Sequence, residues 1–407
     1  MIPRRACALA CLVALEFLAI SGAAERVEAR EPAQQNHSRK FGPGECGPVD
    51  ASYIRVADET GGQPFFLNPS ETAKAFHFVR ETSIGDQAML LRATGTLDDG
   101  RVHDFAVPID STSRRVTFSL SVNTSGSDFA VIDPSGAAVD TANDRTEITV
   151  MNCGRIVTQD APALGTWHVR VGGVGRFWLS VHAKTELSFV TAEFVRMGGR
   201  PGHEGLFRIQ GQPIAGTVAT LRAVVSRERT RTAKIDLVSP HGDVIQTLDV
   251  STESTGSSDE FLGTFVPPSE PFRVRVSGLD DAGHPYQRVF HTQFHAETVE
   301  VIPPAAVDDL SAGAAVPLTF TVRNVGTAAA SFRIIAADGR RFVTRFEPRT
   351  LSLEAATEAA VTVWVSIPPE TAAGTGFDVT VTASGEPPAH TMNGASLHLG
   401  VAGTRGK

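Results

Sequence analysis

Residues 116–122 read Val-Thr-Phe-Ser-Leu-Ser-Val, a strict alternation of apolar and polar side chains. Successive side chains of a β-strand point to opposite faces of its sheet, so this pattern is typical of a strand with one apolar and one polar face. The same period of two recurs along the chain, at Trp167, Val169 and Val171, at Phe177, Leu179 and Val181, at Phe272, Val274 and Val276, and at Val361, Val363 and Val365. The repetition predicts a mainly β protein made of antiparallel sandwiches.

The predicted strands fall into three blocks. The first two, 82–186 and 187–296, share a plan in which a strand leads into a Pro/Gly turn, at 133–136 and again at 239–242, and a strongly alternating strand follows. Pro303-Pro304 marks the next boundary, and the third block, 297–403, has roughly the seven short strands of an immunoglobulin-like sandwich. We therefore expect three tandem β-sandwiches of immunoglobulin-like or jelly-roll type.

The N-terminus has the composition of a secretion signal over residues 1–24. Arg4 and Arg5 precede an apolar run over 6–20, and small residues before Glu25 provide a cleavage site. An uncleaved anchor is the alternative, but the apolar run is shorter than the ~20 residues that a membrane span needs. These features predict a secreted protein that has no membrane span after signal cleavage.

Two segments that differ in composition and periodicity precede the first block of strands. Residues 25–43 are polar and show no periodicity, which predicts a disordered leader. In the following segment, 44–81, Asp50 to Glu59 has helical spacing, and Asn68 and Glu71 form a capping box at the start of a second helix. We expect a small α/β piece that is too short to bury a core of its own.

The charge, the cysteines and the missing motifs limit which partners and which kinds of site the chain can have. A net charge of −8 and a pI of about 5.9 give no electrostatic case for nucleic acid as a partner. Signal cleavage leaves Cys46 and Cys153, which either pair in a disulfide or remain separate thiols, and neither belongs to a Cys-x-x-Cys pair of the kind that holds zinc. Neither Gly-x-Ser-x-Gly nor His-Glu-x-x-His occurs. We predict a protein that is not an enzyme, with no catalytic residues, metal ligands or cofactor.

One dense basic patch is a candidate for partner contact; it comprises Arg227, Arg229, Arg231 and Lys234. On a strand, the three arginines share one face, which would suit a sulfated glycan or an acidic partner. The alternative is an edge strand that its charges protect from pairing with other chains.

Two tryptophans and two asparagines complete the candidate residues. Trp178 and Trp364 fall on the opposite face from their apolar neighbours in alternating strands, which makes them candidates for stacking on sugar rings. Asn36 and Asn123 occupy N-glycosylation sequons, which matter only in a cell that glycosylates its secreted proteins.

Several stretches resemble the hemicentins and related extracellular proteins that carry a von Willebrand factor A domain. The end of that domain is similar to residues 44–46, 53–57, 60–63 and 67–71, and the region that follows it is similar to residues 129–136, 165–169, 187–189, 237–242, 270–272 and 276–280. The resemblance implies that segment 44–81 is the C-terminal remnant of an A domain. It also implies an adhesion or matrix function outside the cell.

The metal-ion-dependent adhesion site of such A domains requires Asp-x-Ser-x-Ser. The nearest string here starts at Asp110, has Thr112 and Arg114 in place of the serines, and lies in the β region, so the metal-dependent function carries over to no residue. We expect a secreted, non-enzymatic adhesion or matrix-type protein that binds an extracellular protein or glycan through its sandwich surfaces. The alternative is a carbohydrate-binding or accessory sandwich array of a secreted system.

Overall fold

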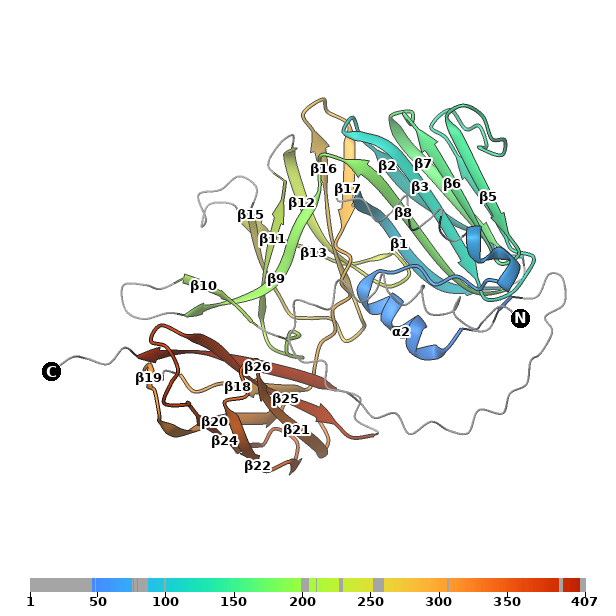
Figure 1. Cartoon of the computed structure of the whole chain (residues 1–407). Coiled ribbons are helices and arrows are strands. Elements are labelled where there is room, and N and C mark those ends of the chain that lie inside the picture. The colour runs from blue at the N-terminus through green and yellow to red at the C-terminus, as the bar shows by residue number, and fades with distance from the viewer. Residues whose placement is uncertain are drawn as a thin grey trace, which may run out of the picture. The chain divides into compact units, whose positions relative to one another are not determined.

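The computed structural model describes residues 46–47, 49–74, 76, 79, 87–98, 100–198, 205–209, 211–226, 230–251, 260–305, 307–387 and 391–402. The chain is mainly β, as predicted, and it divides into two compact units (Figure 1). The larger unit holds the described residues up to 209 and those from 216 to 296, and the smaller unit holds 211–215 and those from 297 onward. The predicted signal, residues 1–24, and the predicted leader, 25–43, lie outside the described residues.

The first sandwich belongs to the larger unit and is built from two antiparallel sheets. One sheet has the order β1-β8-β3-β6-β5, and the other has the order β2-β7-β4. Their apolar faces enclose one core, in which Phe118 packs on Trp167 with ring centroids 5.5 Å apart. The strands are β1 (Gln87–Leu97), β2 (His103–Ile109), β3 (Ser113–Val122), β4 (Asp128–Ile132), β5 (Thr146–Met151), β6 (Gly154–Asp160), β7 (Gly165–Gly172) and β8 (Gly175–Thr185).

The second sandwich completes the larger unit. Its sheets have the orders β10-β9-β11-β15-β14 and β13-β12-β16-β17, and a cluster of phenylalanines fills the space between them. Phe194 is central to this core, because its ring lies 4.9 Å from that of Phe294 and 6.1 Å from that of Phe265. The strands are β9 (Phe189–Gly198), β10 (Gly205–Arg208), β11 (Ala219–Val225), β12 (Thr230–Val238), β13 (Val244–Leu248), β14 (Val250–Ser251), β15 (Glu260–Phe265), β16 (Arg273–Asp280) and β17 (Pro285–Val289).

The third sandwich forms most of the smaller unit. Sheets of order β18-β20-β24-β22 and β19-β26-β25-β21-β23 enclose a core rich in valine, and the short β19 pairs with β26 in parallel. Residues 211–215 add to this unit, because Gln212 N–H donates to Asn393 Oδ1 (3.0 Å). The strands are β18 (Val299–Ile302), β19 (Leu310–Ser311), β20 (Ala315–Asn324), β21 (Ala330–Asp338), β22 (Val343–Glu347), β23 (Thr350–Leu353), β24 (Glu358–Ser366), β25 (Gly376–Gly385) and β26 (Met392–Ala402).

The segment before β1 carries the helices. As predicted, one helix, α2 (Ala51–Thr60), follows Asp50, whose carboxylate accepts from the Ser52 N–H (2.8 Å). The second predicted helix begins as a short 3₁₀ turn, η2 (Pro69–Glu71), where the Glu71 carboxylate accepts from the Asn68 N–H (3.4 Å).

This N-terminal segment packs on the first sandwich. Phe66 lies against Trp178 of β8, with ring centroids 5.2 Å apart, and both side chains are buried. Phe65 and Leu67 pack against Met151 and Ile156. Phe65, Phe66 and Leu67 therefore pack on the outer face of the five-stranded sheet, whereas Tyr53 and Val56 of α2 are exposed.

Candidate functional site: a buried polar junction in the larger unit

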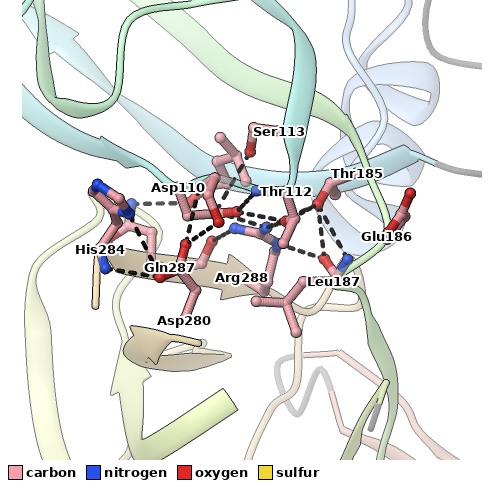
Figure 2. A network of polar contacts seen from close by, with 12 residues as sticks. Asp110, Thr112, Ser113, Thr185, Glu186, Leu187, Asp280, His284, Gln287 and Arg288 are labelled. Carbon is pink, nitrogen blue, oxygen red and sulfur yellow. Dashed lines mark hydrogen bonds and ion pairs between the residues drawn. The ribbon is translucent and has the colours of Figure 1, made fainter. Parts of the chain in front are cut away.

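Arg288 on β17 is the centre of a polar network between the first and second sandwiches (Figure 2). It lies opposite Val276 of β16, at a position that the strand alternation assigns to the core, and its guanidinium is fully buried. The guanidinium forms an ion pair with Asp110 (2.8 Å) and donates to the Leu187 carbonyl (2.6 Å) and to Thr185 Oγ1 (3.0 Å). A buried cation is tolerated only with such partners, and here they come from the β2–β3 turn, from the end of β8 and from the linker between the sandwiches.

Asp110 is held by the turn that follows β2. Its carboxylate accepts from the Thr112 N–H (3.0 Å), and its carbonyl accepts from the Ser113 N–H (3.2 Å). Thr112 Oγ1 lies 2.6 Å from Thr185 Oγ1, which connects the turn to the end of β8. The string that resembles a metal-ion adhesion motif is therefore a capped turn whose carboxylate faces a guanidinium.

A second carboxylate, that of Asp280, joins the same turn to the end of β16. It accepts from the Ser111 N–H (2.9 Å) and Oγ (2.6 Å) and from the His284 N–H (2.7 Å). Burial raises the pKa of the Asp280 carboxyl, but the hydrogen bonds from Ser111 and His284 outweigh burial, so the pKa lies below its usual value. Asp280 therefore remains an ionised acceptor.

The electrostatics of the junction favour a fixed structural role. Burial lowers the pKa of Arg288, and the charge of Asp110 opposes that shift. Each of the three guanidinium nitrogens donates to a protein acceptor, and Gln287 Nε2 adds a bond to the Leu90 carbonyl of β1 (2.9 Å). This arrangement links the two sandwiches by a buried ion pair and hydrogen bonds.

Asp58 of α2 ties the N-terminal segment to both sandwiches. Its carboxylate accepts from Trp178 Nε1 (2.8 Å) and lies 3.8 Å from Arg92 Nη2, and its carbonyl accepts from Arg273. Burial lowers the pKa of Arg92 to about 9 and that of Arg273 to about 10, with Asp58 opposing both shifts. Gln63 also accepts from Arg92 (2.6 Å).

The interpretation of Trp178 as an exposed ring for sugar stacking is wrong. Trp178 does lie on the opposite face from its apolar neighbours, but it is only 1% exposed, because Phe66 and α2 cover that face. Trp364 on β24 is half-buried, and the Arg345 guanidinium lies 3.8 Å from its ring centroid, so one face of this ring is occupied.

The remaining sequence-predicted residues are placed as follows. Lys234 on β12 is exposed and lies 3.0 Å from Asp236, and Arg231 belongs to the same strand. Arg227, Arg229 and Asn36 lie outside the described residues. Asn123 is exposed, although its Oδ1 accepts from the Arg176 N–H (2.8 Å), and Cys46 and Cys153 are joined by a disulfide.

Sequence reasoning missed the junction residues Asp110 and Arg288. The available signal was Arg288 itself, a charged residue at an apolar position of an alternating strand. Within the described ranges, no three His, Cys, Asp or Glu side chains gather where they would hold a metal ion. No helix in the described part of the chain is both long and apolar enough to span a bilayer.

Comparison with known proteins confirms the resemblance inferred from sequence. A family model described as the hemicentin galactose-binding domain-like matches residues 90–186, and one described as the VWA7 Ig-like domain matches 301–403. Hemicentin-1 of Mus musculus and of Homo sapiens are each 24% identical over 263 residues, and Hemicentin-2 of Mus musculus is 22% identical over 260. Each alignment covers 62% of this chain but only 4–5% of the relative's own length.

Proposed function

We propose that this hemicentin-like chain is a secreted, non-enzymatic adhesion or matrix-type protein that binds extracellular protein or glycan partners through its sandwich surfaces. Binding would not depend on a metal-ion adhesion site, because the carboxylate of Asp110 is engaged by Arg288.

The observation that carries the proposal is the buried junction around Arg288. Burying an ion pair costs desolvation energy, so it contributes little net stability compared with apolar packing. Its directional bonds instead specify one geometry between the sandwiches. A fixed pair of sandwiches suits a protein that presents binding surfaces to an extended matrix.

The partner contacts are part of the same proposal. The basic patch of Arg227, Arg229, Arg231 and Lys234 and the half-buried Trp364 are the surface candidates, and Asn36 and Asn123 are the candidate glycosylation sites. Segment 44–81 would be the remnant of an A domain. Its dependence on the first sandwich for burial supports this interpretation.

The test is binding of the purified protein, from residue 25 onward, to wells coated with cell-derived extracellular matrix. We expect saturable binding that excess unlabelled protein displaces and that EDTA does not change. A β-sandwich protein of similar pI and unrelated sequence is the control. Binding no greater than this control would overturn the adhesion function, and abolition by EDTA would overturn metal independence.

A second arm separates protein partners from glycan partners. Matrix treated with glycosidases is compared with matrix treated with a protease. Loss of binding after glycan removal alone would favour the carbohydrate-binding alternative.

A further inference from the structure

A surface pocket of about 400 Å³ lies in the larger unit, where the outer face of β12, β16 and β17 meets the end of β2. Pockets of this size accommodate small ligands. The lining residues are Pro108, Lys234, Ser277, Gly278, Leu279, Pro285, Tyr286 and Gln287.

Three polar side chains form a row across the floor of this pocket. Lys234 is the cross-strand partner of Ser277, and Ser277 is the partner of Gln287. The Gln287 amide nitrogen is engaged by the Leu90 carbonyl, which leaves its oxygen as an acceptor, and the Ser277 hydroxyl has no hydrogen bond to any described residue. The row therefore offers an ammonium, a hydroxyl and an amide oxygen at neighbouring positions.

The walls of the pocket are apolar and stiff. Pro108 and Pro285 contribute rings with fixed backbone torsions, and Leu279 is 41% exposed. Tyr286 borders the pocket between Pro285 and Gln287, but its side chain is buried in the core on the other face of the sheet. Apolar walls around a few convergent polar groups are typical of small-molecule sites, where the polar groups fix the orientation of the ligand.

The charged residue among those that line the pocket is Lys234. Asp236, which lies outside the lining, is fully buried and is held by both Arg275 (2.8 Å) and Lys234 (3.0 Å), so two cations share one carboxylate. The Lys234 side chain is 54% exposed, whereas Asp236 is inaccessible. A ligand therefore meets an ammonium that has spare donors, which favours an anionic group.

The position of the pocket argues against an extended peptide as the ligand. Across the floor, β16 is paired on one side with β12 and on the other with β17, so its backbone groups are engaged. Strand addition requires an unpaired edge, and the floor of this pocket is the middle of a sheet.

We propose that this pocket binds an anionic sugar residue of a glycan, with the acidic group at Lys234 and ring hydroxyls at Ser277 and Gln287. The inference rests on the proposed extracellular function and gives it a ligand class and a site. The anionic group is a carboxylate, as in uronic acids, or a sulfate, and the choice between them is an arm of the test.

The experiment is isothermal titration of the full chain from residue 25 onward with three tetrasaccharides. A hyaluronan tetrasaccharide carries carboxylates alone, a chondroitin sulfate tetrasaccharide adds sulfates, and chitotetraose is neutral. We expect at least one acidic tetrasaccharide to bind about tenfold or more tightly than chitotetraose, which corresponds to one charge-assisted hydrogen bond.

Two variants locate the binding. Lys234→Gln should weaken binding about tenfold, whereas Arg101→Gln, which removes an equal charge from an exposed position outside the pocket, should leave it unchanged. Ser277→Leu fills the pocket without changing the charge and should abolish binding. Melting temperatures close to that of the parent protein would show that both pocket variants fold.

Three results would overturn the site. They are equal binding by Lys234→Gln and Arg101→Gln, equal affinity for chitotetraose and the acidic tetrasaccharides, and no binding of any tetrasaccharide. If the protein still binds matrix in the last case, the pocket assignment fails while the adhesion function stands.

Discussion

Replacing Arg288 by Met tests whether the junction holds the first and second sandwiches together. The substitution keeps a long, flexible side chain but leaves the buried Asp110 carboxylate without its cation. Removing one partner of a buried ion pair costs about 3–5 kcal/mol. Asp110 still accepts the Thr112 N–H (3.0 Å), so we expect a loss near the lower end of that range.

The assay is differential scanning calorimetry of the full chain. For a unit of this size, each kcal/mol corresponds to about 2–4 °C in melting temperature, so a loss of about 3 kcal/mol in Arg288→Met should lower the transition of the larger unit by about 6–12 °C. The matched control is Arg170→Met, whose guanidinium is 54% exposed beside Asp104. An exposed pair of this kind contributes less than about 1 kcal/mol.

The double variant Asp110→Leu, Arg288→Met separates charge from packing. Removing both charges eliminates the uncompensated carboxylate, so most of the lost stability should return. The reasoning is refuted if Arg288→Met melts within about 2 °C of Arg170→Met, which is the shift expected for less than 1 kcal/mol. It is also refuted if the double variant is as unstable as the sum of the two single variants.

Three further predictions concern the N-terminal segment and the sheet beneath it. Cys46 and Cys153 are 107 residues apart, so reduction should cost about 2–5 kcal/mol, measured by urea unfolding with and without reductant; an unchanged midpoint would contradict the disulfide. Trp178→Ala should cost about 3–5 kcal/mol in the same assay, and Trp364→Ala distinctly less, whereas equal losses would contradict the burial of Trp178. Burial and a neighbouring arginine lower the pKa of His182 to about 4, below the ~6.5 of an unfolded chain. Because the unfolded state takes up the proton first, stability should fall as pH decreases from about 6.5 to 4, by on the order of 2–3 kcal/mol. Melting curves of His182→Gln should lack this component, and an identical pH dependence in the variant would disprove the assignment.

The strands could be predicted because their pattern is local. Phe118 and Leu120 alternate with serines, and the structure places the apolar residues in the core and the serines on the opposite face of β3. The first helix was also predictable, because its helical spacing over Asp50 to Glu59 is local, and the structure adds a local cap, the bond from Ser52 N–H to Asp50.

The covering of that opposite face could not be predicted in the same way. Alternation distinguishes the two faces of a strand, but it does not reveal whether another segment lies on the second face. Trp178 was assigned to the correct face and to the wrong environment, because Phe66 is separated from it by more than a hundred residues of sequence.

The junction was missed for a related reason. Asp110 and Arg288 come from different sandwiches, and no periodicity connects them. A charged residue at the core position of a strand predicts that a partner exists, since an unpaired buried charge is too costly. Only the fold identifies which carboxylate that partner is.

The contacts of Arg288 also determine which part of this chain can be duplicated or recombined as one evolutionary unit. A recombination boundary between residues 186 and 187 would look natural, since a complete sandwich lies on each side. It would nevertheless separate Asp110 from Arg288, and each fragment would keep one half of a buried charge pair. Duplication or shuffling should therefore move the two sandwiches together, and fragments made for expression should keep both.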